Sequence, residues 1–204
     1  MSKLYARNLI TINAGGIAAK HPDSDYLFIT PTGVNGVTKA DLKPRDVLKC
    51  DRSGKVIEGR LKPSSEIQLY LKILDLPNIN AVIHATCPIA ISLALAGVEI
   101  KPITPLQGES GLWNGVGIVP FSKELYDTTK YPRISPNLNL RDFTLKSLSN
   151  HKAVILVNHG TITVGENIDE AFYLTELLEE TAIMIHTTHS YTKKFLDAYA
   201  ILEK

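Results

Sequence analysis

Two histidines and one glutamate are the residues of this sequence best suited to metal and proton chemistry. His84 closes the apolar run that begins at Ala81, and His159 follows the apolar run Ala153–Val157. Because the end of a buried strand presents polar groups to a crevice, both imidazoles can bind one divalent cation there. Glu66 lies in the first turn of the helix predicted to start at Ser64, where backbone N–H groups attract negative charge. The alternatives are that each imidazole bonds neighbouring backbone and that Glu66 only complements a helix dipole.

Three short pairs of small residues are suited to binding an anion. They are Gly15-Gly16, Thr32-Gly33 and Ser64-Ser65. Backbone N–H groups in tight turns and at helix starts, together with hydroxyl groups, can hold a phosphate. The same residue types are also the commonest helix caps and turn formers, so each pair taken alone is equally consistent with a structural role.

The elements that must position these residues follow from hydrophobic periodicity and from turn residues. Apolar and β-branched runs predict strands, and apolar residues at helical spacing with capping residues and proline predict helices. This alternation predicts an α/β layered domain, which we expect to occupy residues 1–204 as one domain. The predicted strands are Tyr26–Thr30, Asp46–Cys50, Asn80–His84, Val116–Phe121, Ala153–Val157 and Thr161–Val164, and the predicted helices start at Ser64, Pro88, Leu138 and Asn167.

Length, charge and cysteine content exclude several classes of function. The chain has 204 residues, and its 22 Lys and Arg nearly cancel 21 Asp and Glu, which disfavours nucleic acid as a partner. Its apolar runs are too short to span a bilayer, and no basic segment followed by a long apolar one opens the sequence. Cys50 and Cys87 are the two cysteines, too few for a disulfide framework. We therefore expect a cytoplasmic protein without a membrane partner.

Four separated motifs together resemble the class II aldolase/adducin family. They are Ile29-Thr30-Pro31-Thr32-Gly33, Lys62-Pro63-Ser64-Ser65-Glu66, Ala81-Val82-Ile83-His84 and Val157-Asn158-His159-Gly160, followed by Gly165–Ala171. The resemblance runs from about Leu9 to His186. It implies a three-layer α/β/α sandwich around a mostly antiparallel sheet, and a homotetramer with active sites between subunits.

The resemblance also implies a reaction and a role for each motif residue. Relatives such as fuculose-phosphate aldolase bind a divalent cation, usually zinc, through histidines, and the cation stabilises an enediolate during aldol cleavage. Carried over to this sequence, His84 and His159 bind the metal and Glu66 is the catalytic acid/base. The phosphate of a small sugar substrate would be held by Gly15, Thr32, Gly33, Ser64 and Ser65.

Two positions depart from the family pattern and keep other functions open. Thr86 stands where the family has its second histidine ligand, and the thiol of Cys87 comes one position later. Gly16 replaces the asparagine of the family's phosphate loop. We interpret the sequence as that of a metal-dependent lyase that cleaves a phosphorylated sugar. The alternatives are a sugar-phosphate dehydratase or epimerase, and a family member that has lost catalysis and acts as a binding or assembly module.

Overall fold

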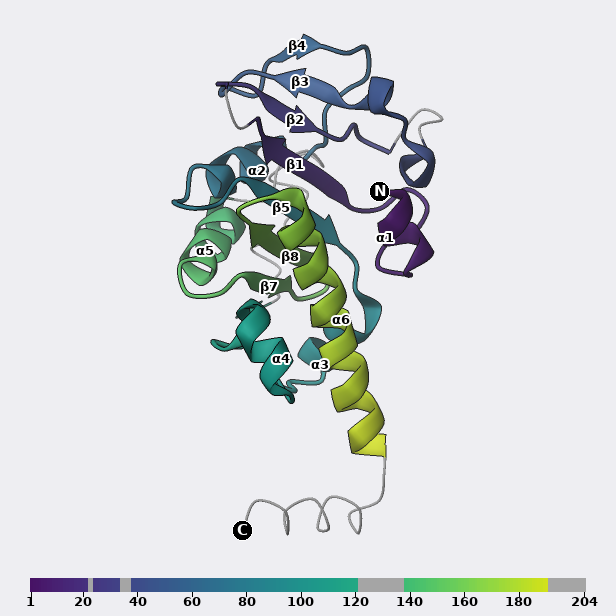
Figure 1. Cartoon of the computed structure of the whole chain (residues 1–204), viewed down its shortest axis with the longest axis vertical. Coiled ribbons are helices and arrows are strands. Elements are labelled where there is room, and N and C mark those ends of the chain that lie inside the picture. The colour runs from purple at the N-terminus through teal and green to yellow at the C-terminus, as the bar shows by residue number, and fades with distance from the viewer. Residues whose placement is uncertain (22–23, 34–37, 121–137, 191–204) are drawn as a thin grey trace.

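One mixed sheet organises the part of the chain that the computed structural model describes, residues 1–21, 24–33, 38–120 and 138–190. Its strand order is β4-β3-β2-β1-β5-β8-β7-β6 (Figure 1). All neighbouring strands pair antiparallel except β6 and β7, which are parallel. The strands are β1 (Gly16–Lys20), β2 (Leu27–Ile29), β3 (Leu48–Cys50), β4 (Val56–Glu58), β5 (Ala81–Ala85), β6 (Gly117–Val119), β7 (Ala153–Leu156) and β8 (Gly160–Gly165).

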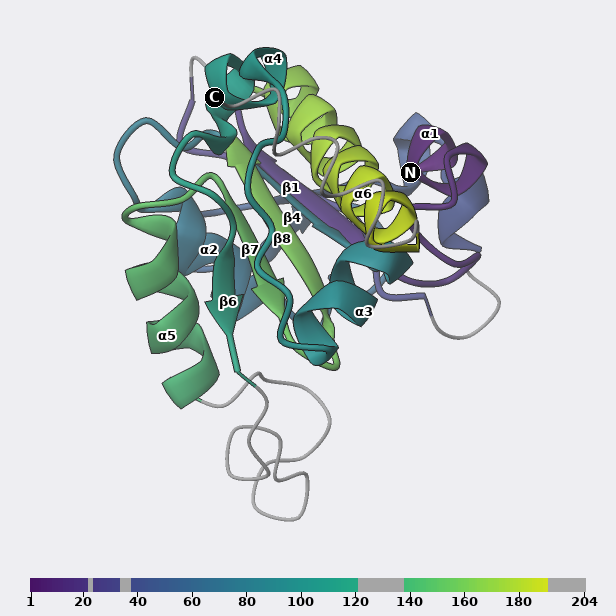
Figure 2. The ribbon, with the colours of Figure 1, turned by 90° about the horizontal axis from the view of Figure 1, so that it is seen from below.

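Helices cover both faces of this sheet. Figure 2 shows α2 and α5 on one side of the strands and α3 and α6 on the other, and two separate hydrophobic cores fill the spaces between the layers. This arrangement confirms the predicted α/β/α sandwich around a mostly antiparallel sheet. The helices are α1 (Ser2–Ala6), α2 (Ile67–Leu74), α3 (Pro88–Leu95), α4 (Pro105–Gln107), α5 (Leu138–Leu148) and α6 (Ile168–Ser190), with short helical turns at Lys39–Asp41, Pro44–Asp46 and Gly108–Leu112.

The central strand β5 is buried along its whole length because helices lie over both of its faces. Side chains alternate across a strand, so Ile83 packs in the core beneath α6 while Val82 packs in the core beneath α2. His84 follows Ile83 and therefore lies on the α2 face. The same alternation in β8 sends Thr163 toward α6, where its hydroxyl is 2.6 Å from that of Thr175.

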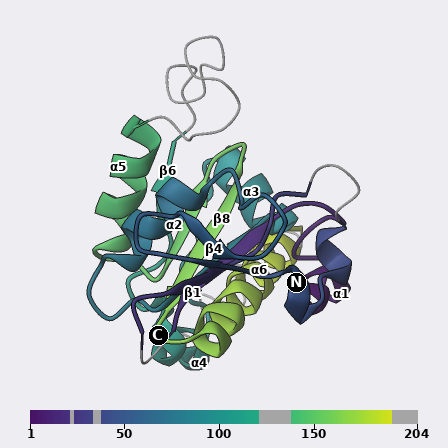
Figure 3. The ribbon, with the colours of Figure 1, turned by 90° about the horizontal axis from the view of Figure 1, so that it is seen from above.

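The long helix α6 begins as its sequence predicts. The Asn167 side chain accepts a hydrogen bond from the backbone N–H of Glu170 at 2.9 Å. The Glu170 carboxylate reaches back to the N–H of Glu166 at 2.7 Å, so both side chains satisfy otherwise unpaired donors. Figure 3, seen from the opposite side to Figure 2, shows α6 running in nearly the same direction as β1 and β8. None of the helices in the described residues is long and apolar enough to cross a membrane.

Two predicted boundaries near the site are wrong. Helix α2 starts at Ile67 with Glu66 as its N-cap residue, so Ser64 does not cap it. The Ser64 hydroxyl instead accepts the N–H of Glu66 at 3.3 Å, which makes a tight turn before the helix. The predicted strand at Asp46 begins only at Leu48, because Pro44 starts a helical turn that includes Asp46.

Candidate metal and catalytic site

A sharp turn between β7 and β8 carries His159 to the α2 face of the sheet. Asn158 has φ of 64°, the left-handed conformation that asparagine tolerates well, and the N–H of His159 donates to the carbonyl of Leu156 at 2.9 Å. Gly160 follows, and a Cβ atom at this position would collide with Nε2 of His84. A glycine here therefore allows the two histidines to approach, with ring centroids 5.0 Å apart.

Glu66 lies between the two histidines that the sequence singled out. Its Oε2 atom forms a short contact with Nδ1 of His84, and its Oε1 atom lies 3.0 Å from Nε2 of His159. The hydroxyl of Tyr70, one helical turn later, donates to Oε2 at 2.8 Å. The Glu66 side chain is 12% exposed and that of His84 is 9% exposed. Residues from three distant parts of the sequence thus form one cluster, in which Glu66 and His84 are nearly buried and His159 is 29% exposed.

The cluster changes the acidity of its members. Burial by itself would raise the pKa of Glu66, but the charges of His84 and His159 and their hydrogen bonds outweigh it, and the pKa lies well below its usual range. Burial, with the nearby negative charge of Glu66, raises the pKa of Tyr70 well above its usual range. Glu66 is therefore an ionised carboxylate and Tyr70 a neutral hydrogen-bond donor at neutral pH.

The donor atoms of this cluster fit a divalent metal ion. One atom each from Glu66, His84 and His159 lie within 4.8 Å of one another. Two imidazoles and a carboxylate are a common ligand set for zinc and for other first-row divalent ions, and three protein ligands leave positions for a substrate. Within the described residues, these three side chains are the ones that can hold the cation.

Neither residue at the divergent motif position joins the cluster. The Thr86 hydroxyl donates to the carbonyl of Leu9 at 2.8 Å, which ties it to the loop before β1. Cys87 has φ of 39° and lies fully buried in the core beneath α6, where its sulfur accepts the Thr161 hydroxyl at 3.3 Å. Burial raises the pKa of the Cys87 thiol to about 12, although the hydrogen bond from Thr161 acts to lower it. The possibility that Cys87 replaces the missing histidine is therefore wrong in this structure.

The loops expected to bind phosphate lie side by side. The N–H of Thr32 donates to the carbonyl of Lys62 at 2.9 Å, and the N–H of Ser64 donates to the carbonyl of Thr30 at 3.2 Å. Ser64 is buried and Ser65 is exposed. Two of the backbone N–H groups expected to face a phosphate are thus used within the protein, which shifts the expected contacts to side chains and to the remaining N–H groups.

The two glycines of the predicted phosphate set both lie at close approaches of the backbone. Gly15 has φ of 75°, and a Cβ atom there would lie 2.7 Å from the carbonyl oxygen of His84. A Cβ atom on Gly33 would lie 2.6 Å from the carbonyl oxygen of Asn13 and 3.2 Å from Cε of Lys39. The loop that contains Gly15 therefore lies between strand β5, which carries His84, and the Thr32-Gly33 turn.

Sequence reasoning missed two polar residues of this region, Tyr70 and Lys39. Tyr70 had a detectable signal, because a residue four positions after Glu66 lies on the same side of a helix. Lys39 is 7% exposed, and its ammonium group donates to the carbonyl of Gly15 in a short hydrogen bond. Burial lowers the pKa of Lys39, and the charge of Glu66 partly offsets this effect. Its sequence position, 24 residues from Gly15, gave no indication of this contact.

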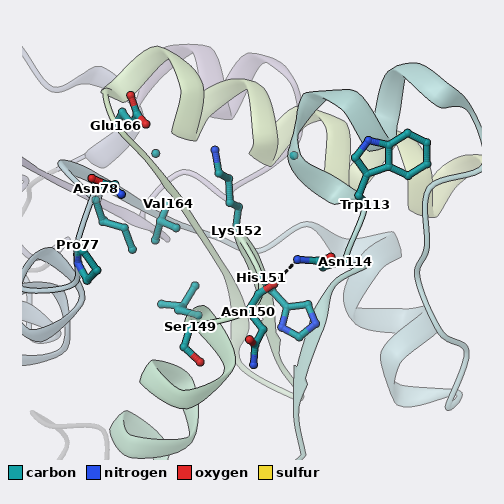
Figure 4. A pocket seen from close by; sticks show the side chains of 14 residues that line it. Pro77, Asn78, Trp113, Asn114, Ser149, Asn150, His151, Lys152, Val164 and Glu166 are labelled. Carbon is teal, nitrogen blue, oxygen red and sulfur yellow. Dashed lines mark hydrogen bonds between the residues drawn. The ribbon is translucent and has the colours of Figure 1, made fainter.

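A separate cleft of about 440 Å³ lies at the other end of the sheet (Figure 4). It lies beside Gly165, which pairs with Ala81 at the start of β5, whereas His84 is near the end of β5. Trp113, His151 and Lys152 line the cleft. Lys152 forms an ion pair with Glu170, and Nδ1 of His151 lies 2.9 Å from the carbonyl oxygen of Ser147. His151 and Lys152 therefore have partners within the fold, and the cleft is distinct from the Glu66 cluster.

The fold and this cluster define a known class of protein. The family model for the Class II Aldolase and Adducin N-terminal domain matches residues 1–186. The chain belongs to this family, which confirms the resemblance inferred from its four motifs.

Similar proteins of known name or structure agree with this assignment. The chain is 32% identical over 182 residues to an L-fuculose phosphate aldolase of Methanocaldococcus jannaschii, covering 88% of each sequence. It is 29% identical over 189 residues to a 5-deoxy-D-ribulose 1-phosphate aldolase of Bacillus thuringiensis, covering 92% of this chain and 81% of the relative. The crystal structure of L-fuculose-1-phosphate aldolase from Thermus thermophilus superposes with a TM-score of 0.72 at 23% identity, covering 91% of this chain and 88% of that one, and shows the shared fold.

Proposed function

We propose that this protein is a metal-dependent lyase that cleaves a small phosphorylated ketose by a reverse aldol reaction. The observation that carries the proposal is the placement of an ionised, nearly buried Glu66 between His84 and His159. The names of the two relatives support the substrate class, because both are aldolases of sugar phosphates. Zinc is the cation that we propose, with His84 and His159 as the residues that hold it and Glu66 beside them.

The reaction requires two proton transfers and no oxidant. Cleavage of a ketose 1-phosphate between carbons 3 and 4 releases an aldehyde and dihydroxyacetone phosphate. The hydroxyl on carbon 4 loses a proton, and carbon 3 of the departing half gains one. A bound divalent cation would supply a Lewis acid that withdraws electrons from the neighbouring carbonyl group.

Glu66 is the residue that we assign to the proton at carbon 3. Its low pKa keeps it ionised, so it can take the proton from carbon 3 in the synthetic direction and return it during cleavage. The nitrogen of His84 that contacts Glu66 is also an atom suited to bind a cation. When it binds a cation, the hydrogen bond from Tyr70 still holds the Glu66 carboxylate in place. Gly15, Thr32, Gly33, Ser64 and Ser65 are proposed to hold the phosphate through hydroxyls and the N–H groups not already paired.

The assembly and location remain part of the proposal. We expect a homotetramer in the cytoplasm, as the family resemblance implies. Large apolar side chains around α4 support burial against another copy, since Leu106, Trp113 and Ile103 are 64%, 63% and 46% exposed. Light scattering coupled to size exclusion tests this expectation, and a monomer at micromolar concentration would contradict it.

Metal binding and cleavage test the proposal together. We expect zinc, cobalt or manganese to raise the melting temperature of the wild-type chain, and the His84→Ala, His159→Ala double variant to lose this response. His151→Ala is the matched control, because His151 lies beside the distant cleft. Release of dihydroxyacetone phosphate from ketose 1-phosphates should require Glu66, so Glu66→Gln should abolish it. Loss of water or a change of configuration at carbon 4, without cleavage, would instead identify a dehydratase or an epimerase.

A further inference from the structure

Lys39 is a buried cation that the proposed reaction has not used. It lies in the helical turn Lys39–Asp41, is 7% exposed, and donates to the carbonyl of Gly15. An ammonium group has three N–H donors, and this is the hydrogen bond that it makes within the described residues. Burying a charged amine with unused donors is unfavourable unless a partner compensates for the lost water. The surroundings of Lys39 therefore indicate what that partner is.

The neighbours of Lys39 are the residues expected to surround the substrate's phosphate. Its ammonium contacts the carbonyl of Gly15, its Cε lies 3.2 Å from where a Cβ of Gly33 would be, and its backbone N–H donates to the Asn13 side chain at 3.4 Å. Glu66 is close enough to influence its charge. Lys39 thus lies between the phosphate-binding loops and the catalytic carboxylate.

Several donors of the phosphate loops are already used within the protein, and Lys39 is the buried positive charge beside them. The N–H groups of Thr32 and Ser64 donate to protein carbonyls, and the Ser64 hydroxyl accepts the N–H of Glu66. Gly16 has no side chain to donate, and the hydroxyl of Tyr70 lies 2.5 Å from where its Cβ atom would be. A dianion held only by neutral donors beside the negative charge of Glu66 would be poorly compensated.

We infer that Lys39 is the residue that neutralises and binds the anionic end of the substrate, a phosphate monoester, beside Gly15 and Gly33. This inference rests on the proposed function for the identity of the whole substrate, but the anion site itself does not. A charge-assisted hydrogen bond from a buried ammonium is about twice as strong as a neutral one, and it selects a dianion over a neutral hydroxyl group. Lys39 would therefore make unphosphorylated sugars bind more weakly than their phosphate esters.

Binding of inorganic phosphate tests the inference without an assay of turnover. The melting temperature of the full chain is measured against phosphate concentration, with sodium chloride at matched ionic strength as the reference. We expect Lys39→Met to weaken phosphate binding about ten- to hundredfold, as loss of a charged hydrogen bond predicts, and Lys39→Arg to retain most of it. Lys43→Met, which removes an exposed positive charge four residues later, is the control and should bind phosphate like the wild type.

The outcomes separate this inference from the proposed lyase activity. Equal phosphate binding by Lys39→Met and wild type, or no phosphate response in the wild type, overturns the role of Lys39. If Lys39→Met does not fold, phosphate binding is compared between Lys39→Gln and Lys39→Arg. Equal binding by the two variants overturns the role of Lys39 in binding phosphate. Binding by Lys39→Arg alone supports that role. A Lys39-dependent phosphate site in a chain that cleaves no ketose phosphate would support the anion site and contradict the proposed lyase.

Discussion

Gly160→Ala is predicted to damage the metal site while leaving every ligand in place. The added methyl group would collide with Nε2 of His84 and would lie 2.6 Å from the carbonyl oxygen of Ala85. Gly160 pairs with Leu156 and its neighbour Thr161 pairs with Ala85, so the backbone is held between two strands and cannot easily retreat. The His84 ring must move instead.

The size of the effect follows from the tightness of this contact. Inserting a methyl group into a close-packed interior costs about 1–3 kcal/mol of unfolding free energy. Displacing a ligand by a change in its supporting residues costs about ten- to hundredfold in metal affinity. Both effects are expected, because the ring of His84 belongs to the packed α2 face of the sheet and to the cluster with Glu66.

Two titrations measure these effects separately. Urea unfolding in the presence of a chelator gives the stability change, and zinc competition with a chelating dye gives the affinity. Gly97→Ala is the matched control: Gly97 has φ of 72° with nothing near its added methyl, so this variant should lose about 1 kcal/mol through backbone strain but keep its zinc affinity. Wild-type zinc affinity in Gly160→Ala would refute the account of how the histidines are held.

Three further substitutions test other parts of the account. Tyr70→Phe should lower kcat about ten- to hundredfold with zinc affinity nearly unchanged, because it removes the hydrogen bond that positions Glu66; unchanged kcat would show that this bond is dispensable. Cys87→Ala should keep zinc affinity within about twofold, since a thiol with a pKa of about 12 in the core is not a ligand; a large loss of affinity would restore it as one. Glu170→Gln should cost about 0.3–1 kcal/mol at neutral pH, because glutamine can keep the capping hydrogen bond but loses the negative charge near the helix N-terminus and Lys152. Its hydrogen bonds with Lys152 and Glu166 outweigh the effect of burial and lower the folded-state pKa of Glu170 below 4.5, so in urea unfolding the cost should shrink as the pH falls below that value, and a constant cost would contradict the linkage.

The order of strands and helices around His84 and His159 could be predicted because it depends on local patterns. His84 and His159 each follow a run of apolar residues that is too short for a helix, and the structure places both beside Glu66. The two faces of β5 follow from simple alternation, which sets His84 opposite Ile83.

Residues brought in by long-range contacts could not be predicted in the same way. Nothing in the sequence around Lys39 distinguishes it from a surface lysine. The folded loop places it against Gly15 and Gly33. Cys87 follows His84 closely, but its left-handed backbone turns the thiol into the opposite core. The sequence indicates which residues are suited to chemistry, while the path of the backbone decides which of them meet.

Hydrogen exchange at carbon 3 of dihydroxyacetone phosphate tests the central claim most directly. This half-reaction needs the cation site and Glu66 but no knowledge of the aldehyde product. In heavy water with zinc, the account predicts that the wild-type chain exchanges one of the two protons on that carbon, as followed by proton NMR, and that Glu66→Gln does not. No exchange by a wild-type chain that binds zinc, or equal exchange by Glu66→Gln, would contradict the role of this cluster.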